Sequence, residues 1–203
     1  MSAAGLILAA GESRRMGFPK ALLRYGKETF LDTLTALLGA RCSPVIVVLG
    51  AHSARIRAGA LRPATFVENA DWARGMTTSL QCGLRAVPPD ADGVLFTLVD
   101  HPAASPATLD ALLAPRGLIG APLVRVPRYR DERGHPIWFD RQLIPEFLAL
   151  AADGAAREVV RRHVDRTEFL DLDDPGVVAD IDNPDDYRAL TRDGAGAGTG
   201  DGA

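Results

Sequence analysis

Apolar residues occur along the first half of the chain in short continuous runs, separated by segments with helical spacing. The continuous runs cover residues 5–10, 45–49, 64–67 and 94–99. Runs of this kind are typical of strands that are buried on both faces of a sheet. Helical spacing of apolar residues occurs at 29–38, 77–86 and 106–113, the last opened by Ser105 and a proline. The alternation predicts an α/β fold with a mostly parallel central sheet that helices cover on both sides.

The pattern changes after residue 120. Short strands are predicted at 122–126 and 137–139, around a charged turn at 128–134, and further short strands at 168–172 and 177–181. Helices are predicted at 141–151, 155–163 and 184–190, the last capped by Asn183. Residues 193–203 are rich in Gly and Ala and lack periodicity, so we expect a disordered tail there. We therefore expect residues 1–192 to form a single domain.

Composition limits the classes of partner. The chain has 203 residues, 47% of them apolar, which is enough for one sizeable core. Its net charge of −3 argues against a general binder of nucleic acids or anionic membranes, so we expect small molecules or proteins as partners. Cys42 and Cys82 form no CxxC pair, and no apolar run is long enough to span a bilayer. These features predict free thiols and a cytoplasmic location.

The charges are distributed unevenly along the chain. Residues 1–27 carry five basic side chains and one acidic side chain, a net of +4, whereas residues 165–203 carry eleven acidic and three basic side chains, a net of −8. The two lysines of the chain, Lys20 and Lys27, both lie in the basic segment. All other permanent side-chain cations are arginines, so the compact ammonium of Lys20 is a candidate for a specific role.

The loop after the first predicted strand has features of a phosphate site. Ligands of open parallel sheets bind beyond the carboxyl ends of the strands, so this position is informative. The small residues Ala9, Ala10 and Gly11 allow backbone N–H groups to approach a ligand closely, and Arg15 and Lys20 could reach phosphate oxygens together. The loop contains neither a Walker A motif nor a GxGxxG dinucleotide motif.

Acidic residues follow two other predicted strands. Asp100 comes directly after the run at 94–99, where a metal ligand and a turn-capping aspartate are both compatible with the spacing, the cap being favoured. Asp180 and Asp182 are predicted to share one face of a short strand, where two carboxylates repel unless a cation or solvent lies between them. A metal site and a solvated acidic strand end both remain open for this pair.

Two further polar residues are ambiguous from the sequence alone. His135 precedes a proline in a predicted turn, where substrate contact and the more common structural role are both compatible with the sequence. Ser79 lies near the start of a predicted helix, where its hydroxyl is placed to hydrogen-bond a ligand. No histidine and acid complete a nucleophile pattern with Ser79, so a Ser-His-Asp hydrolase is not indicated.

The string LAAGESRRMGFPK at 8–20 closely resembles LAAGxSxRMGxPK, the N-terminal motif of the nucleotidyltransferases typified by the molybdenum-cofactor guanylyl- and cytidylyltransferases. The resemblance covers nearly the whole chain. The segment GMTTSL at 75–80 looks like the family's second nucleotide-side segment, and GHP at 134–136 looks like a motif of its cytidylyltransferase branch. The segment DIDNPDDY at 180–187 is similar to the family's DxDTPEDL, and DHP at 100–102 stands where the family commonly has Asp-Gln-Pro.

This resemblance implies a role for each matching residue. The implied nucleotide-binding residues are Leu8, Ala9, Ala10, Gly11, Arg15, Lys20, Gly75 and Ser79. Arg15, Lys20 and Asp100 would be catalytic, and Asp100 and Asp182 would bind Mg²⁺, with Asp180 a possible addition. His101 replaces the usual glutamine, which leaves the product-side contacts open; His101 and His135 are possible substrate-binding residues.

The resemblance also implies a fold and an activity. The fold is a Rossmann-like three-layer sandwich of the nucleotide-diphospho-sugar transferase type. The activity is Mg²⁺-dependent transfer of a nucleoside monophosphate, CMP from CTP, to the phosphate of molybdopterin, with a molybdenum hydroxylase as a possible partner. A guanylyltransferase, or an enzyme for another phosphorylated acceptor, keeps the same chemistry. A cofactor-binding chaperone for a molybdenum enzyme and a redox enzyme on the same fold are alternatives from other classes.

Overall fold

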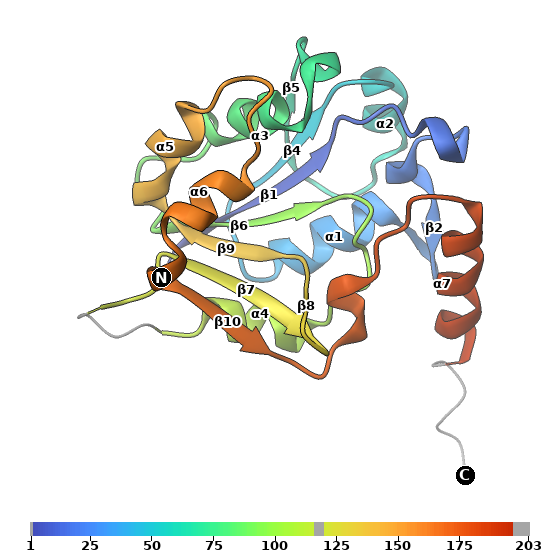
Figure 1. Ribbon diagram of the computed structural model, residues 1–203. Coiled ribbons are helices and arrows are strands. Elements are labelled where there is room, and N and C mark those ends of the chain that lie inside the picture. Colours follow the sequence, from blue (N-terminus) through green and yellow to red (C-terminus); the bar gives the residue numbers. More distant parts are fainter. Residues whose placement is uncertain (1, 116–119, 197–203) are drawn as a thin grey trace.

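A central eight-stranded sheet organises the computed structural model, which describes residues 2–115 and 120–196 (Figure 1). Seven strands follow one another across the sheet in the order β10-β7-β9-β6-β1-β4-β5, and β8 pairs with β7. Their bounds are β1 Ala3–Ala9, β4 Val45–Leu49, β5 Thr65–Glu68, β6 Gly93–Leu98, β7 Val124–Tyr129, β8 Glu132–Arg133, β9 Ile137–Asp140 and β10 Thr167–Asp171. The first half of the chain thus supplies one side of the sheet and the second half the other.

Most strands of this sheet run in the same direction. The pairs β1–β4, β1–β6, β4–β5 and β7–β10 are parallel, whereas β9 runs antiparallel to both β6 and β7. Leu8 of β1 is in register with Val48 of β4 and with Leu98 of β6, so these three strands end at the same level. The residues that follow them therefore meet at one edge of the sheet. The predicted α/β fold with a mostly parallel sheet is confirmed.

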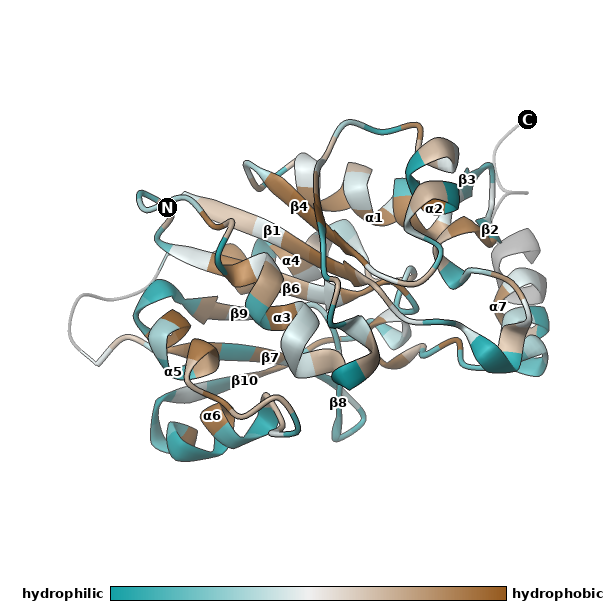
Figure 2. Ribbon diagram, turned by 90° about the horizontal axis from the view of Figure 1, so that it is seen from above, coloured by the Kyte–Doolittle hydropathy of each residue, from teal (hydrophilic) through white to brown (hydrophobic). Residues whose placement is uncertain are grey.

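Helices cover both faces of the sheet. On one face, α1 (Phe30–Gly39), α2 (Ser53–Gly59) and α4 (Pro106–Leu113) pack against one hydrophobic cluster; on the other, α3 (Met76–Leu84), α5 (Ile144–Leu148) and α6 (Arg157–Arg162) pack against a second. Ile7 of β1 belongs to the first cluster, and its neighbours Leu6 and Leu8 belong to the second. Burial on both faces explains why the apolar runs are continuous. In Figure 2 the ribbon of β4 is largely brown, that of β1 changes from pale to brown along its length, and the outer helices carry much of the teal.

Side-chain caps set the start of two helices, and the sequence predicted the one at Ser105. Ser105 caps α4 by accepting a hydrogen bond from the Thr108 backbone N–H at 3.3 Å, and Thr29 caps α1 in the same way. Between the main elements of the described chain lie the short hairpin of β2 (Arg24–Tyr25) and β3 (Glu28–Thr29) and six 3₁₀ helices. These are η1 Arg14–Met16, η2 Lys20–Leu22, η3 Trp72–Arg74, η4 Arg141–Leu143, η5 Val164–Arg166 and η6 Pro175–Val178.

The prediction of a strand at 177–181 is wrong. The chain there forms η6 and then an irregular segment, because Asp174 holds a turn. Its Oδ1 accepts a hydrogen bond from the Gly176 N–H at 3.0 Å, and its Oδ2 accepts from the Ser105 N–H at 2.8 Å. The Ile181 N–H donates to the Asp100 carbonyl at 3.1 Å, which ties the segment to the end of β6.

Other element boundaries also differ from the predictions. The predicted helix at 141–151 divides into η4 and α5, and the one at 155–163 begins at Arg157. The last helix, α7 (Pro184–Gly196), continues past the expected end at 190 and includes the first four residues of the expected tail. The rest of that tail, 197–203, lies outside the described residues. Within the described chain, no helix has the length and apolar character needed to cross a membrane.

Candidate functional site

A cleft of about 480 Å³ opens at the carboxyl ends of β1 and β6. Its walls come from the loop after β1, from η2, from the segment that joins η3 to α3, and from the end of β6. Ten of the residues assigned to the site from the sequence line it: Leu8, Ala9, Ala10, Gly11, Arg15, Lys20, Gly75, Ser79, Asp100 and Asp182. The level strand ends bring these residues together although they are up to 174 positions apart, from 8 to 182.

Close backbone packing fixes one wall of the cleft. The Ala51 N–H donates to the Ala10 carbonyl at 3.0 Å, which joins the loops after β1 and β4. Gly50 has no room for a side chain, because a Cβ there would lie 2.7 Å from the Ala10 carbonyl oxygen and 2.6 Å from the Trp72 Cβ. Ala10 and Trp72 both line the cleft, so the size of residue 50 sets how the two walls pack.

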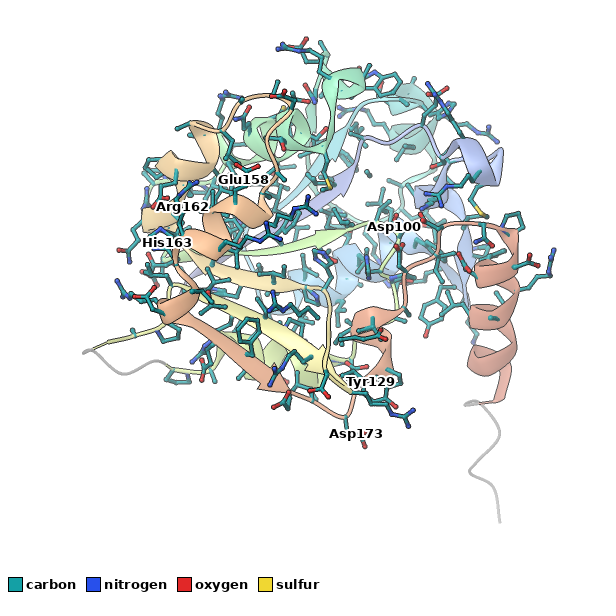
Figure 3. The ribbon with its side chains drawn as sticks, in the orientation of Figure 1. Asp100, Tyr129, Glu158, Arg162, His163 and Asp173 are labelled. Carbon is teal, nitrogen blue, oxygen red and sulfur yellow. The ribbon has the colours of Figure 1, made fainter. Side chains whose placement is uncertain are left out.

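Lys20 lies between two carboxylates at the bottom of the loop. Its Nζ is 2.8 Å from Asp100 Oδ2 and 2.8 Å from Asp182 Oδ1, and its side chain is 11% exposed. Arg15 adds a second cation, with Nη1 2.7 Å from Asp182 Oδ2. Figure 3 shows Asp100 beyond the end of β6, beside the segment that leads into α7. The basic start and the acidic end of the chain therefore converge on one site.

These contacts alter the ionisation of the groups. Burial alone lowers the pKa of Lys20, but the hydrogen bonds and charges of Asp100 and Asp182 together outweigh burial and raise it. The hydrogen bond from Lys20 lowers the pKa of Asp182, and Arg15 lowers it further. Lys20 is thus a permanent cation and Asp182 a permanent anion at neutral pH.

Asp100, His101 and Asp180 form a group with the donor atoms of a metal site. One ligand atom from each lies within 4.8 Å of the others. Asp100 Oδ1 and His101 Nδ1 are buried and have no hydrogen-bond partner among the described residues, so donors of the kind that a divalent cation uses are available. The chemistry of this set fits a divalent cation. The family resemblance assigned the second metal ligand to Asp182 and gave Asp180 as a possible addition, whereas this group contains Asp180 and not Asp182.

The two histidines lie together behind Asp100, outside the lining of the cleft. The ring centroids of His101 and His135 are 4.8 Å apart, and the His135 ring meets Phe96 edge-on at 5.6 Å. Burial lowers the pKa of His101, and it lowers the pKa of His135 to about 3, so His135 is neutral at physiological pH. Burial, followed by the charge of Asp100, raises the pKa of Asp180.

Asn69 holds the cleft residue Ser79 by a hydrogen bond, a role that the sequence did not indicate. It is 6% exposed, and its Nδ2 donates to Thr78 Oγ1 at 2.9 Å and to Ser79 Oγ at 3.0 Å. Its Oδ1 accepts from the Asp71 N–H at 3.0 Å. Because Ser79 Oγ accepts from Asn69, the Ser79 hydroxyl keeps its own proton to donate into the cleft. Asn residues are common between a strand and a turn for conformational reasons. Only the tertiary packing therefore shows that Asn69 bonds to Ser79.

The cleft combines small residues, two cations and a set of carboxylates at the edge of a parallel sheet. Such an α/β domain has the groups that a phosphorylated ligand and a divalent cation would require. Residues 5–167 match the family model of the MobA-like NTP transferase domain. The chain belongs to this nucleotidyltransferase family.

The chain is similar over most of its length to proteins with different named activities. The chain is 33% identical to nicotine blue oxidoreductase of Paenarthrobacter nicotinovorans, over 92% of this chain and 95% of the relative. It is 26% identical to the molybdenum cofactor cytidylyltransferase of Escherichia coli K12, over 90% and 92%. The crystal structure of Rv0371c of Mycobacterium tuberculosis H37Rv aligns with a TM-score of 0.80 at 34% identity, covering 95% of this chain and 99% of that one. Its complex with manganese aligns at 0.78 and 33%, with the same coverage.

Proposed function

We propose that this chain is a Mg²⁺-dependent nucleotidyltransferase that transfers CMP from CTP to the phosphate of molybdopterin and releases pyrophosphate. The observation that carries the proposal is the position of Lys20, held by Asp100 and Asp182 in the cleft beside Arg15. A cation pair next to carboxylates matches the need to neutralise a triphosphate and to recruit a metal at the same place.

The side chains divide the chemistry between them. The small residues after β1 bring backbone close to the base and ribose, and Ser79 donates a hydrogen bond from the opposite wall. Arg15 and Lys20 stabilise the charge that grows on the departing pyrophosphate, each contributing roughly 2–4 kcal/mol to the transition state. The acceptor phosphate is already ionised at pH 7, so no general base is required.

A divalent cation, when bound, supplies neutralisation of phosphate charge and alignment of the reacting groups. Asp100 would hold it, and family resemblance assigns the second ligand to Asp182. The manganese complex of Rv0371c, a relative with 33% identity, supports a divalent cation in this domain.

The choice of CTP rests on the segments at 75–80 and 134–136 and on the similarity to the cytidylyltransferase of E. coli. GTP, or another phosphorylated acceptor, would use the same residues. The product would pass to a molybdenum hydroxylase in the cytoplasm. A chaperone that only binds the finished cofactor would show stoichiometric binding and no chemical step that depends on Asp100.

The test is pyrophosphate release with CTP, GTP, ATP or UTP in the presence of molybdopterin. We expect turnover with CTP, and a loss of at least a hundredfold in kcat for Asp100→Asn, which removes one negative charge at the site. Asp173→Asn is the matched control, because Asp173 is exposed and lies outside the cleft lining. Turnover with GTP and not with CTP would show that GTP is the nucleotide substrate. No turnover with any of the four nucleotides would refute the activity on molybdopterin.

An oxidoreductase is the second candidate, because the chain is 33% identical to nicotine blue oxidoreductase over nearly the full length of both. We propose that in this case the same cleft holds a redox cofactor with a nucleotide part. Co-purification of a flavin, or oxidation of NADH or NADPH with a quinoid dye as electron acceptor, would support this function. Pyrophosphate release without either would refute it.

A further inference from the structure

The donor set beside Asp100 differs from an all-oxygen magnesium site. Asp100 and His101 follow β6, and Asp180 comes from the segment after η6. One ligand atom from each of the three lies within 4.8 Å of the others. His101 is 7% exposed, and its Nδ1 is a buried nitrogen with no hydrogen-bond partner in the described chain. A buried ring nitrogen without a hydrogen-bond partner costs free energy unless it has a ligand to bind.

The two aspartates of the last segment have different surroundings. Both oxygens of Asp182 contact cations: Oδ1 contacts Lys20 at 2.8 Å, and Oδ2 contacts Arg15 at 2.7 Å. Asp180 has no such cationic partner in the described part of the chain, and Asp100 has one oxygen, Oδ1, left unpaired. Asp100 Oδ1 and the exposed carboxylate of Asp180 are therefore the oxygens of this group that are left free to bind a cation.

The backbone holds these two carboxylates in place. The Ile181 N–H donates to the Asp100 carbonyl at 3.1 Å, so the residue before Ile181 is adjacent to the end of β6. The turn upstream is fixed from both sides: Gly176 packs against the Ala103 carbonyl and Gly134 against the Val177 carbonyl, with no space for a Cβ at either glycine. The donor set is consequently built into the fold.

We propose that His101 and Asp180, in place of the Asp182 that the family resemblance assigns, complete the divalent-cation site with Asp100. The histidine nitrogen makes this site bind Mn²⁺ and Co²⁺ more tightly than Mg²⁺. Imidazole nitrogen binds these transition ions well, whereas Mg²⁺ prefers oxygen ligands and retains its water. The use of the cation in catalysis rests on the proposed function, but its binding does not.

The test uses the full chain without nucleotide. Binding of Mn²⁺ is followed by electron paramagnetic resonance, and Mg²⁺ is measured by its displacement of Mn²⁺. We expect Mn²⁺ to bind at least tenfold more tightly than Mg²⁺, and pulsed measurements to show coupling of the manganese to a ¹⁴N nucleus. His101→Gln should remove that coupling and weaken Mn²⁺ binding at least tenfold, while Mg²⁺ binding changes by less than about threefold.

The two aspartates provide the matched comparison. Asp180→Asn should weaken Mn²⁺ binding at least tenfold, and Asp182→Asn by less than about threefold; circular dichroism checks that each variant is folded. Equal affinity for the two ions, an absent nitrogen signal, or a larger loss in Asp182→Asn than in Asp180→Asn would overturn the proposal. If Mn²⁺ binds tightly but no nucleotidyl transfer occurs, the proposed function alone is refuted. If transfer occurs but the bound Mn²⁺ shows no coupling to nitrogen, this ligand set alone is refuted.

Discussion

Replacing Lys20 by methionine removes the cation that holds two carboxylates together. Each contact of 2.8 Å is worth roughly 6 kcal/mol at an effective dielectric constant of about 20. Dehydrating the ammonium and the carboxylates costs several kcal/mol per ion, and after the substitution both carboxylates, which are 20% and 33% exposed, regain part of their hydration. We therefore expect a net loss of about 3 kcal/mol in the free energy of unfolding at pH 7.

The pH dependence of this loss is the sharper part of the prediction. Lys20 lowers the pKa of Asp182 from its ordinary value of 3.8. A carboxyl group with a lowered pKa in the folded state contributes stability above its unfolded pKa, and that stability is lost as the pH falls through the folded value. The variant lacks this contribution, so the difference between Lys20→Met and the parent should be largest near pH 7 and should shrink below pH 4.

Urea unfolding followed by circular dichroism measures the difference at each pH. Lys27→Met is the matched control, because Lys27 is the other lysine of the chain and is exposed; we expect it to stay within about 0.5 kcal/mol of the parent. A loss below 1 kcal/mol for Lys20→Met, or one that is constant from pH 7 to pH 3.5, would refute the reasoning.

Three further perturbations test other parts of the site. Gly50→Ala puts a methyl group 2.6 Å from the Trp72 Cβ, so it should lower the free energy of unfolding in urea by about 1–3 kcal/mol and raise the nucleotide KM. Gly39→Ala is the control: its methyl group would have its nearest contact at 3.7 Å and should not destabilise the protein. Asn69→Ala removes three hydrogen bonds and should cost about 2–4 kcal/mol and raise the nucleotide KM severalfold; an unchanged KM would show that the network does not position the ligand. His135 has a pKa of about 3, below its ordinary 6.5, so it contributes stability above pH 6.5 that is lost on acidification. In His135→Gln the fall in unfolding free energy between pH 6.5 and 4 should therefore be shallower by up to about 1.4 kcal/mol per pH unit. Equal slopes in the variant and the parent would contradict the lowered pKa.

The sequence allowed the core strands and the main cleft residues to be predicted because their signals are local. A continuous apolar run such as the one ending at Ala10 needs no knowledge of its neighbours to be recognised as a buried strand. The family motif at 8–20 located Arg15 and Lys20 for the same reason. The prediction of a strand at 177–181 was wrong because the apolar residues there indicate burial but not conformation. The turn before them is held by Asp174, which also accepts a hydrogen bond from Ser105, 69 positions away, and no local pattern shows this contact.

Sequence alone therefore determined the α/β class, the sheet edge at which the site lies, and half of the residues that line the cleft. Only the tertiary structure decided how the charged residues are paired. Register aligned the ends of β1, β4 and β6, and this alignment placed Lys20 between Asp100 and Asp182 while leaving Asp180 beside His101. The physical reason is that apolar periodicity depends on residues that are neighbours in the chain. The electrostatic partner of a side chain depends instead on distances between segments that are far apart in the chain.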